Sequence, residues 1–308
     1  MGNALRARHI ALYGEALRPP TVLLPLDKHP QRSDPPSSPA DRPAPAHGVQ
    51  VAPLSMEWSD LTVTVKIGGF LKKKVPLQIL APCSGTASPG DLLAIMGPSG
   101  SGKTTLLDAL ANRLTSDKVK GKVTYGGATF SASEQHKHVS YVAQDDSLMG
   151  VFTVTETLVQ AARFCYGYSI SGAKLTEIVD EAIETVGLAS AAHTIVGDIF
   201  RKGISGGQKR RLSLAVELIK KPSVLIVDEP TSGLDSASAY GVMRNLTALC
   251  KAGHTIITTI HQPSSEIYGM FDQFMLLSKV RTVHSITYTP TRHTRGEEAF
   301  ALWLRLRS

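Results

Sequence analysis

A glycine-rich stretch near residue 100 has the residue types and spacing to bind the phosphates of a nucleotide. It reads Gly97-Pro98-Ser99-Gly100-Ser101-Gly102-Lys103-Thr104-Thr105. An apolar run, 92–96, precedes it and an amphipathic segment, 106–114, follows it, which predicts a strand, a turn and a helix. Glycines let successive backbone N–H groups converge on phosphate oxygens, and the helix N-terminus adds its positive dipole end. The alternative is a chance glycine turn before a helix, but every fixed position of the motif matches. We therefore predict that the chain binds a nucleoside triphosphate.

The end of this stretch and a later pair of acids supply groups for phosphate chemistry. Lys103 would reach the β- and γ-phosphates, and the Thr104 hydroxyl would bind Mg²⁺. The apolar run 224–227 predicts a buried parallel strand that ends in Asp228-Glu229. There Asp228 would hold Mg²⁺ through water, and Glu229 would act as general base on the attacking water. The alternative is a pair of solvated carboxylates that begin a turn.

Three further motifs are weaker signals when each is taken alone. Ser205-Gly206-Gly207-Gln208 precedes an apolar helix predicted over 212–219. A small-residue turn of this kind is either an anion site or an ordinary helix entry. Ser232-Gly233-Leu234-Asp235 opens the next predicted helix. His261 ends a strand predicted over 255–260; such a histidine is often a satisfied structural residue, but this strand follows the acidic one, so we expect a γ-phosphate contact.

The remaining patterns predict the elements that must position these residues. Alternating and β-branched stretches indicate an antiparallel pair of strands before the glycine-rich stretch and two strands after its helix. Apolar residues at three- and four-residue spacings indicate helices in the middle of the chain. The lysine-rich segment 68–74 is expected to be a hairpin tip or surface loop. The predicted strands cover 61–65, 77–80 with a continuation at Thr86, 120–125 and 139–143, and the further helices cover 155–164, 175–186 and 236–250.

Composition narrows the class of protein. The chain has 308 residues with 42% hydrophobic content, which is ordinary for a globular protein. The net charge of +7 is concentrated at the ends, since residues 51–278 carry only +1, so a nucleic-acid-binding face is not indicated. No apolar run approaches the ~20 residues that span a bilayer. Three scattered cysteines are expected to be reduced thiols.

Taken in order along the chain, these motifs resemble those of the ATP-binding cassette (ABC) ATPases. The resemblance covers about residues 54–279, and Ser205-Gly206-Gly207-Gln208 matches the sequence that separates this family from other phosphate-loop enzymes. Three stretches further resemble the G-type (White-related) subfamily, whose members carry the nucleotide-binding domain before a membrane domain. They are Gln144-Asp145-Asp146, 231–236 and 260–265.

The resemblance implies an α/β fold: a phosphate-loop NTPase of ABC type with a mixed core sheet, an antiparallel β subdomain and a helical subdomain at about 155–221. It implies that ATP and Mg²⁺ bind and that two cassettes, alike or different, pair head to tail. Ser205, Gly206, Gly207 and Gln208 would then contact the partner's nucleotide. Gln144 would sense the γ-phosphate, help to bind Mg²⁺ and signal to the membrane domain. Asp235 would steady the interface, and His261 would orient the γ-phosphate.

The domain plan follows from the resemblance and from two atypical ends. We expect a disordered Pro-rich tail over 1–50, the cassette over 51–279 and a basic, non-family tail over 280–308. Family members often stack adenine on an aromatic residue at a place that falls near Val63, which cannot stack. Val280 stands where the family has glycine, and no membrane domain follows.

Three functions therefore remain open from the sequence. The first is the ATPase motor of a G-type transporter of lipids or other hydrophobic compounds, placed on the cytoplasmic side of a membrane by its membrane domain. The second is a soluble, cytosolic ABC ATPase, although such proteins usually carry two cassettes. The third is an ATP-binding module without turnover, which an intact Glu229 argues against.

Overall fold

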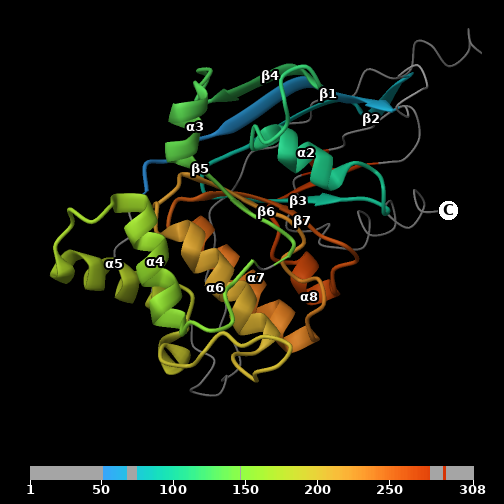
Figure 1. The fold of residues 1–308 in the computed structure, drawn as a ribbon. Coiled ribbons are helices and arrows are strands. Elements are labelled where there is room, and N and C mark those ends of the chain that lie inside the picture. The colour runs from blue at the N-terminus through green and yellow to red at the C-terminus, as the bar shows by residue number, and fades with distance from the viewer. Residues whose placement is uncertain (1–50, 68–74, 146, 278–286, 289–308) are drawn as a thin grey trace, which may run out of the picture. The chain divides into compact units, whose positions relative to one another are not determined.

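The computed structural model describes residues 51–67, 75–145, 147–277 and 287–288 (Figure 1). Within these residues, six strands form a central sheet in the order β5-β6-β7-β3-β8-β9. Neighbouring strands from β5 to β8 are parallel, and β9 pairs antiparallel with β8. The strands are β3 (Leu92–Met96), β5 (Val139–Val142), β6 (Val224–Val227), β7 (Thr255–Thr259), β8 (Gln273–Leu276) and β9 (Thr287–Tyr288).

A second, antiparallel sheet has the order β2-β1-β4. The long strand β1 (Met56–Ile67) pairs on one side with β2 (Val75–Ala87) and on the other with β4 (Val119–Tyr125). This sheet confirms the antiparallel pair predicted before the glycine-rich stretch. The predicted hairpin tip at 68–74 and the predicted tails at 1–50 and 280–308 lie outside the described residues, apart from β9.

Apart from α2, which follows Gly102, the α-helices begin at residues whose side chains accept from a free N–H group of the first turn. Ser131, Thr153 and Ser205 each form a capping box, in which the cap accepts from the third backbone N–H and the third side chain bonds back. The helices are α2 (Lys103–Leu110), α3 (Ala132–His138), α4 (Val154–Tyr166), α5 (Gly172–Thr185), α6 (Gly206–Leu218), α7 (Ser236–Lys251) and α8 (Ser265–Tyr268), with a 3₁₀ turn η2 (Ala189–Ala191).

Successive residues of the central strands face two different layers. Leu92, Ala94 and Met96 of β3 belong to the core built with α4 to α8, whereas Leu93 and Ile95 belong to the core built with α2 and the antiparallel sheet. Figure 1 shows α2 and the antiparallel strands on one side of the central sheet and α4 to α7 on the other. Because both faces are buried, β3 and β6 are continuous apolar runs, whereas β7 also contains three buried threonines. The predicted α/β architecture is confirmed.

Several boundaries differ from those that the sequence predicts. Helix α2 ends at Leu110, before the predicted 114, because Asn112 adopts a left-handed backbone with φ 53°. Helix α6 begins at Gly206 instead of Leu212, because the capping box of Ser205 starts it in spite of two glycines. Helices α3 and α8 and strand β8 were not expected.

The cysteines agree with their predicted state. Cys83, Cys165 and Cys250 are all free thiols, the first and last of them buried. Burial raises the pKa of the Cys83 thiol to about 11, so it stays protonated at neutral pH. Reactive thiolate chemistry is therefore not expected at Cys83.

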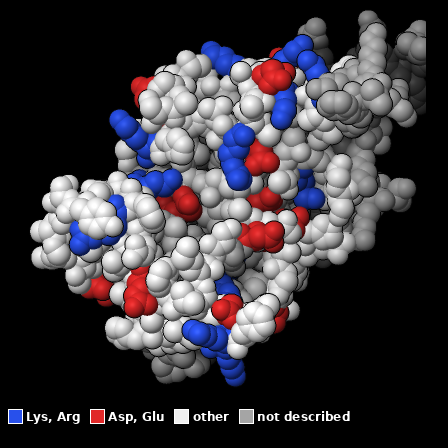
Figure 2. Space-filling model, in the orientation of Figure 1, with Lys and Arg blue, Asp and Glu red and all other residues white. Residues whose placement is uncertain are grey.

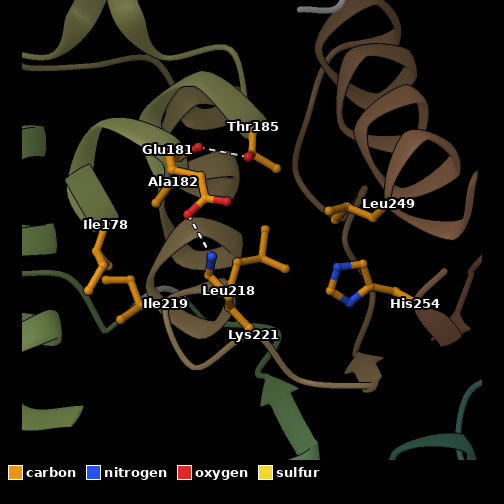
Figure 3. Close-up of a pocket in the computed structure, with 9 residues that line it drawn as sticks. All are labelled: Ile178, Glu181, Ala182, Thr185, Leu218, Ile219, Lys221, Leu249 and His254. Carbon is orange, nitrogen blue, oxygen red and sulfur yellow. Dashed lines mark hydrogen bonds and ion pairs between the residues drawn. The ribbon is translucent and has the colours of Figure 1, made fainter. Parts of the chain in front are cut away.

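A small cavity of about 20 Å³ lies near the amino ends of β6 and β7, at the opposite edge of the sheet from the glycine-rich loop (Figure 3). An ion pair between Glu181 and Lys221 of 2.7 Å borders it. His254 is fully buried and its Nδ1–H donates to the Pro222 carbonyl at 2.7 Å, whereas its Nε2 has no hydrogen-bond partner within the described part of the chain. The lining residues are Ile178, Glu181, Ala182, Thr185, Leu218, Ile219, Lys221, Leu249 and His254.

The buried imidazole predicts a loss of stability on mild acidification. Desolvation lowers the pKa of His254, although the Pro222 carbonyl opposes this shift, so the folded chain binds a proton at lower pH than the unfolded chain does. The free energy of unfolding should therefore fall as the pH drops below the unfolded value of about 6.5, by at most about 1.4 kcal/mol per pH unit. Urea titrations at several values between about pH 8 and pH 5, a range that includes the histidine pKa, measure this change in the free energy of unfolding.

His254→Asn keeps a donor for Pro222 and should flatten this part of the pH dependence. The matched control is His193→Asn, at an exposed histidine, which should leave the slope as in the wild type. Equal slopes for wild type and His254→Asn would contradict the assignment to His254.

Candidate active site

Four neighbouring parallel strands bring the predicted functional residues to one edge of the sheet. The order β5-β6-β7-β3 places four chain segments side by side at the carboxyl ends of these strands. Gln144 follows β5, Asp228-Glu229 follows β6, His261 follows β7 and the glycine-rich loop follows β3. Ligands of open α/β sheets bind at this kind of edge.

The glycine-rich loop has a backbone that side chains would obstruct. A Cβ at Gly97 would lie 2.3 Å from the Leu277 carbonyl oxygen, and Gly100 and Gly102 adopt φ of 75° and 95°. The Lys103 ammonium donates to the Gly97 and Pro98 carbonyls at 3.0 and 3.3 Å. The Lys103 side chain therefore folds back onto its own loop instead of extending into solvent.

The loop also carries hydroxyl donors of the kind that phosphate requires. Within the loop, Ser101 Oγ is buried and has no hydrogen-bond partner among the described residues. Ser99 and Thr104 are exposed, and Thr105 is half-buried. The hydroxyls of this loop and the N-terminus of α2 can therefore bind a phosphate chain.

The two acids after β6 occupy different environments. Asp228 is 2% exposed, and its carboxylate accepts from the Thr259 hydroxyl and, at 3.4 Å, from the Tyr141 hydroxyl. Glu229 is half-buried, and its Oε2 accepts from Gln144 Nε2 at 3.1 Å. The structure thus brings Gln144 and Glu229 together, 85 residues apart in the chain.

Tyr141 remains a hydrogen-bond donor to Asp228 at neutral pH. Burial raises the pKa of its phenol, and the neighbouring Asp228 and Asp108 raise it further. Arg113, which pairs with Asp108 at 3.2 Å, lies over the Tyr141 ring at 4.1 Å from the ring centre. The sequence analysis missed Tyr141, because its role follows from a contact between two strands.

Arg210 is a second residue that the sequence analysis missed. Its guanidinium, 4% exposed, donates from one terminal nitrogen to the carbonyls of Ala143 and Gln144 and from the other to the carbonyl of Asp228. Helix α6 is thereby fixed to the ends of both β5 and β6. The only sequence signal is a basic residue on a helix that is otherwise apolar on its buried face, within Lys209-Arg210-Arg211.

Ser205 and Asp235 act as the caps of neighbouring helices. Ser205 Oγ accepts from Gln208 N at 3.2 Å, and the Gln208 side chain accepts from Ser205 N at 2.8 Å. Asp235 accepts from Ser238 N at 3.0 Å, and hydrogen bonds from Ser238 lower the pKa of this carboxyl. Gly206 and Gly207 lie on the first turn of α6. The contacts predicted for these residues with a second cassette stay predictions.

His261 and Val63 occupy contrasting positions. His261 is exposed just beyond β7, on the expected edge of the sheet, and its γ-phosphate contact stays a prediction. Val63 is 1% exposed in the core of the antiparallel sheet. Its side chain therefore offers no face to a nucleotide base, and the lack of stacking at that place stays a prediction.

The donor set at this edge fits Mg²⁺ held jointly by protein and nucleotide. No group of three or more His, Cys, Asp or Glu side chains able to hold a metal occurs in the described ranges. Mg²⁺ does not require one, because it is usually bound through one or two protein oxygens together with substrate phosphates. The Asp228 carboxylate and the exposed Thr104 hydroxyl are oxygen donors of this type.

Comparison with known proteins defines the class. A family model described as "ABC transporter" matches residues 80–232. The chain is 42% identical over 257 residues to ABC transporter G family member 2 of Arabidopsis thaliana, covering 79% of this chain and 34% of that protein. It is 41% identical over 266 residues to ABC transporter G family member STR of Petunia hybrida, covering 85% of this chain and 32% of that protein. The chain thus spans about a third of the length of these relatives.

Solved structures show the same fold. A dimeric bacterial ABC transporter cassette superposes with a TM-score of 0.61 at 22% identity, covering 76% of this chain and 98% of that one. A dimeric post-hydrolysis state of the same cassette, bound to ADP and Pi, gives a TM-score of 0.60. The described fold is therefore that of an ATP-binding cassette.

The chain belongs to the ABC transporter family, as a nucleotide-binding domain. Its similarity to G family members over most of its length makes it a G-type cassette. Among the residues that the structure describes, none of the helices combines the length and the apolar character needed to cross a bilayer.

Loss of the Arg210 guanidinium should destabilise the chain strongly. In Arg210→Met the carbonyls of Ala143, Gln144 and Asp228 lose their donor inside the protein, and each bond to a charged group contributes about 1.5–3 kcal/mol. We expect the free energy of unfolding to fall by at least about 3 kcal/mol, measured by urea titration.

The control for this variant is Arg201→Met, because Arg201 is an exposed arginine of the same chain. Its free energy of unfolding should stay within about 0.5 kcal/mol of the wild-type value. An Arg210→Met variant as stable as Arg201→Met would show that α6 does not depend on this guanidinium.

Proposed function

We propose that the chain binds and hydrolyses MgATP as the motor domain of a G-type ABC transporter. The observation that carries this proposal is the meeting of four segments at the carboxyl edge of β5, β6, β7 and β3. The phosphate loop, the two acids, Gln144 and His261 all lie there. The cassette itself extends over about residues 51–279.

The hydrogen bond between Gln144 and Glu229 orients the side chain of the proposed base. The Gln144 amide donates to Glu229 Oε2 at 3.1 Å, so the carboxylate is oriented but half-buried and able to accept a proton from water. A γ-phosphate bound at the edge of the sheet would compete for both side chains. Gln144 would then report the nucleotide, and Glu229 would be free to take the proton of the attacking water.

Lys103 and the loop would hold the β- and γ-phosphates. The ammonium now donates to two carbonyls of its own loop, and phosphate oxygens would replace these acceptors. The backbone amides of residues 97–105 and the Ser101 hydroxyl would complete the binding of the phosphate chain. His261 would contact the γ-phosphate from the neighbouring strand.

Thr104, Asp228 and Gln144 would hold Mg²⁺ together with the phosphates. When bound, the ion neutralises charge on the β- and γ-phosphate oxygens. The protein's part is positional, since the Thr259 and Tyr141 hydroxyls orient the Asp228 carboxylate from the side of the core.

We further propose that two cassettes pair and act with a membrane domain. Ser205 to Gln208 would contact the nucleotide of a second cassette, and Asp235 would lie at that interface. The dimeric state of the bacterial cassette and the names of the G family relatives support this arrangement. Closure would exclude water from the site, and hydrolysis would move the membrane helices that pass lipids or other hydrophobic compounds.

Removing the proposed base should abolish hydrolysis without abolishing binding. Glu229→Gln should lower the ATPase rate by at least about 100-fold, the usual contribution of a general base. Its affinity for ATP, measured by isothermal titration, should stay near that of the wild type. Lys103→Ala should instead weaken ATP binding itself.

Glu184→Gln is the matched control, an exposed glutamate of α5 far along the chain from the site. It should hydrolyse ATP as the wild type does. If Glu229→Gln and wild type turn over ATP at equal rates, Glu229 is not the base. If the wild type binds ATP without any turnover, the chain is a binding module.

A further inference from the structure

One hydroxyl contacts both acids of the proposed site. Thr259, the last residue of β7, is fully buried. Its Oγ1 donates to Asp228 Oδ1 and accepts the backbone N–H of Glu229 at 2.8 Å. Because a hydroxyl carries a single proton, donation to the carboxylate leaves its lone pairs for the amide, and the two bonds support each other.

The residue whose amide is bound has an unusual backbone. Glu229 adopts φ 42°, in the left-handed region that side chains other than glycine rarely enter. Such conformations persist only where the surroundings hold them, and they occur often at active sites. Here the surroundings are identifiable, and two bonds hold the main chain of Glu229.

These two hydrogen bonds replace the regular pairing of β6 with β7, which ends at Val227. Val227 of β6 is the last residue in register with β7, opposite Thr258, and Asp228 N donates to the Val142 carbonyl of β5 at 2.9 Å. The N–H of Glu229 therefore turns to the Thr259 side chain, and its carbonyl accepts from Ser232 N at 3.1 Å. Only the first of these bonds depends on a side chain of the neighbouring strand.

We propose that Thr259 is the positioning residue of the base: its hydroxyl holds Glu229 in the left-handed conformation that directs the carboxylate to Gln144 and the phosphate edge. The proposal rests on the proposed function, since it takes Glu229 as the base. Thr259 itself touches no substrate. Its loss should therefore slow the step at Glu229 and leave the binding of nucleotide without Mg²⁺ intact. Because the hydroxyl also bonds to Asp228, the exchange of the Glu229 amide is measured besides the rate.

The neighbouring residue provides a matched control. Thr258 is equally buried in the same strand, but its hydroxyl donates to the Val227 carbonyl at 3.0 Å, away from both acids. Valine has the shape of threonine with a methyl group in place of the hydroxyl. Thr259→Val and Thr258→Val therefore remove the same group from the same strand, and only the first loses the contact with Glu229.

The kinetic test measures single-turnover hydrolysis of MgATP by each variant of the full chain, with the protein in excess over the nucleotide. Thr259→Val should be about 10- to 100-fold slower than wild type, the usual effect of a small misplacement of a catalytic group. Its Kd for ATP, measured in EDTA so that no turnover occurs, should change less than about 2-fold. Thr259→Ser, which keeps the hydroxyl, should recover most of the rate, and Thr258→Val should resemble wild type.

A second measurement does not depend on turnover. Amide hydrogen exchange at Glu229 should be faster in Thr259→Val than in wild type and Thr259→Ser, because its N–H has lost its acceptor. Equal exchange in all three, or equal slowing of hydrolysis by Thr258→Val and Thr259→Val, would overturn the role of Thr259. If Thr259→Val fails to fold, Thr259→Cys takes its place, because a thiol is a weak hydrogen-bond partner. Thr259→Cys should then show slower hydrolysis and faster exchange at Glu229 than Thr259→Ser, and equal values would overturn the role of Thr259.

The two proposals fail in different ways. If Glu229→Gln hydrolyses ATP as fast as the wild type does, the assignment of Glu229 as the base is refuted, whatever the effect of changing Thr259. Hydrolysis that depends on Glu229 but not on the hydroxyl at 259 refutes the positioning role alone.

Discussion

Burial of both faces of a parallel sheet is the constraint on which this site depends. Strands β3 and β6 are apolar on both sides, and β7 combines isoleucines with buried threonines, because one layer of helices and one antiparallel sheet cover them. Strands β3, β5, β6, β7 and β8 carry no charged residue, so the charged groups of the site follow the strand ends. Since the strands from β5 to β3 are parallel, their carboxyl ends meet at one edge, and the acids, the glutamine and the phosphate loop converge there.

Local patterns in the sequence were sufficient for the parts of the site that are local in structure. The phosphate loop, with Lys103 at its end, and the Asp228-Glu229 strand end are short stretches whose residue types state their chemistry. The α/β class follows from apolar runs such as 224–227. The capping box of Ser131 and Glu134, which starts α3, is also local and could have been recognised.

The parts that could not be predicted depend on contacts between distant segments. Arg210 and Thr259 are ordinary residues of a helix and a strand in the sequence, and only the fold shows that both bond to the chain around Asp228. Tyr141 is likewise defined by its neighbour on β6. Helix starts were misplaced for a related reason, because glycine in the first turn of α6 weakens the local signal while the cap supplies it.

The two glycines of α6 have a mechanical consequence. A Cβ at Gly207 would lie 2.8 Å from Ser238 Cβ, and one at Gly206 would lie 3.3 Å from Leu234. The start of α6 therefore packs directly against the side chains of Ser238 in α7 and of Leu234 just before that helix, and α6 itself contributes no side chain at these two positions. The glycines thus let the two helix starts that Ser205 and Asp235 cap lie close together, so a shift of one helix start would displace the other.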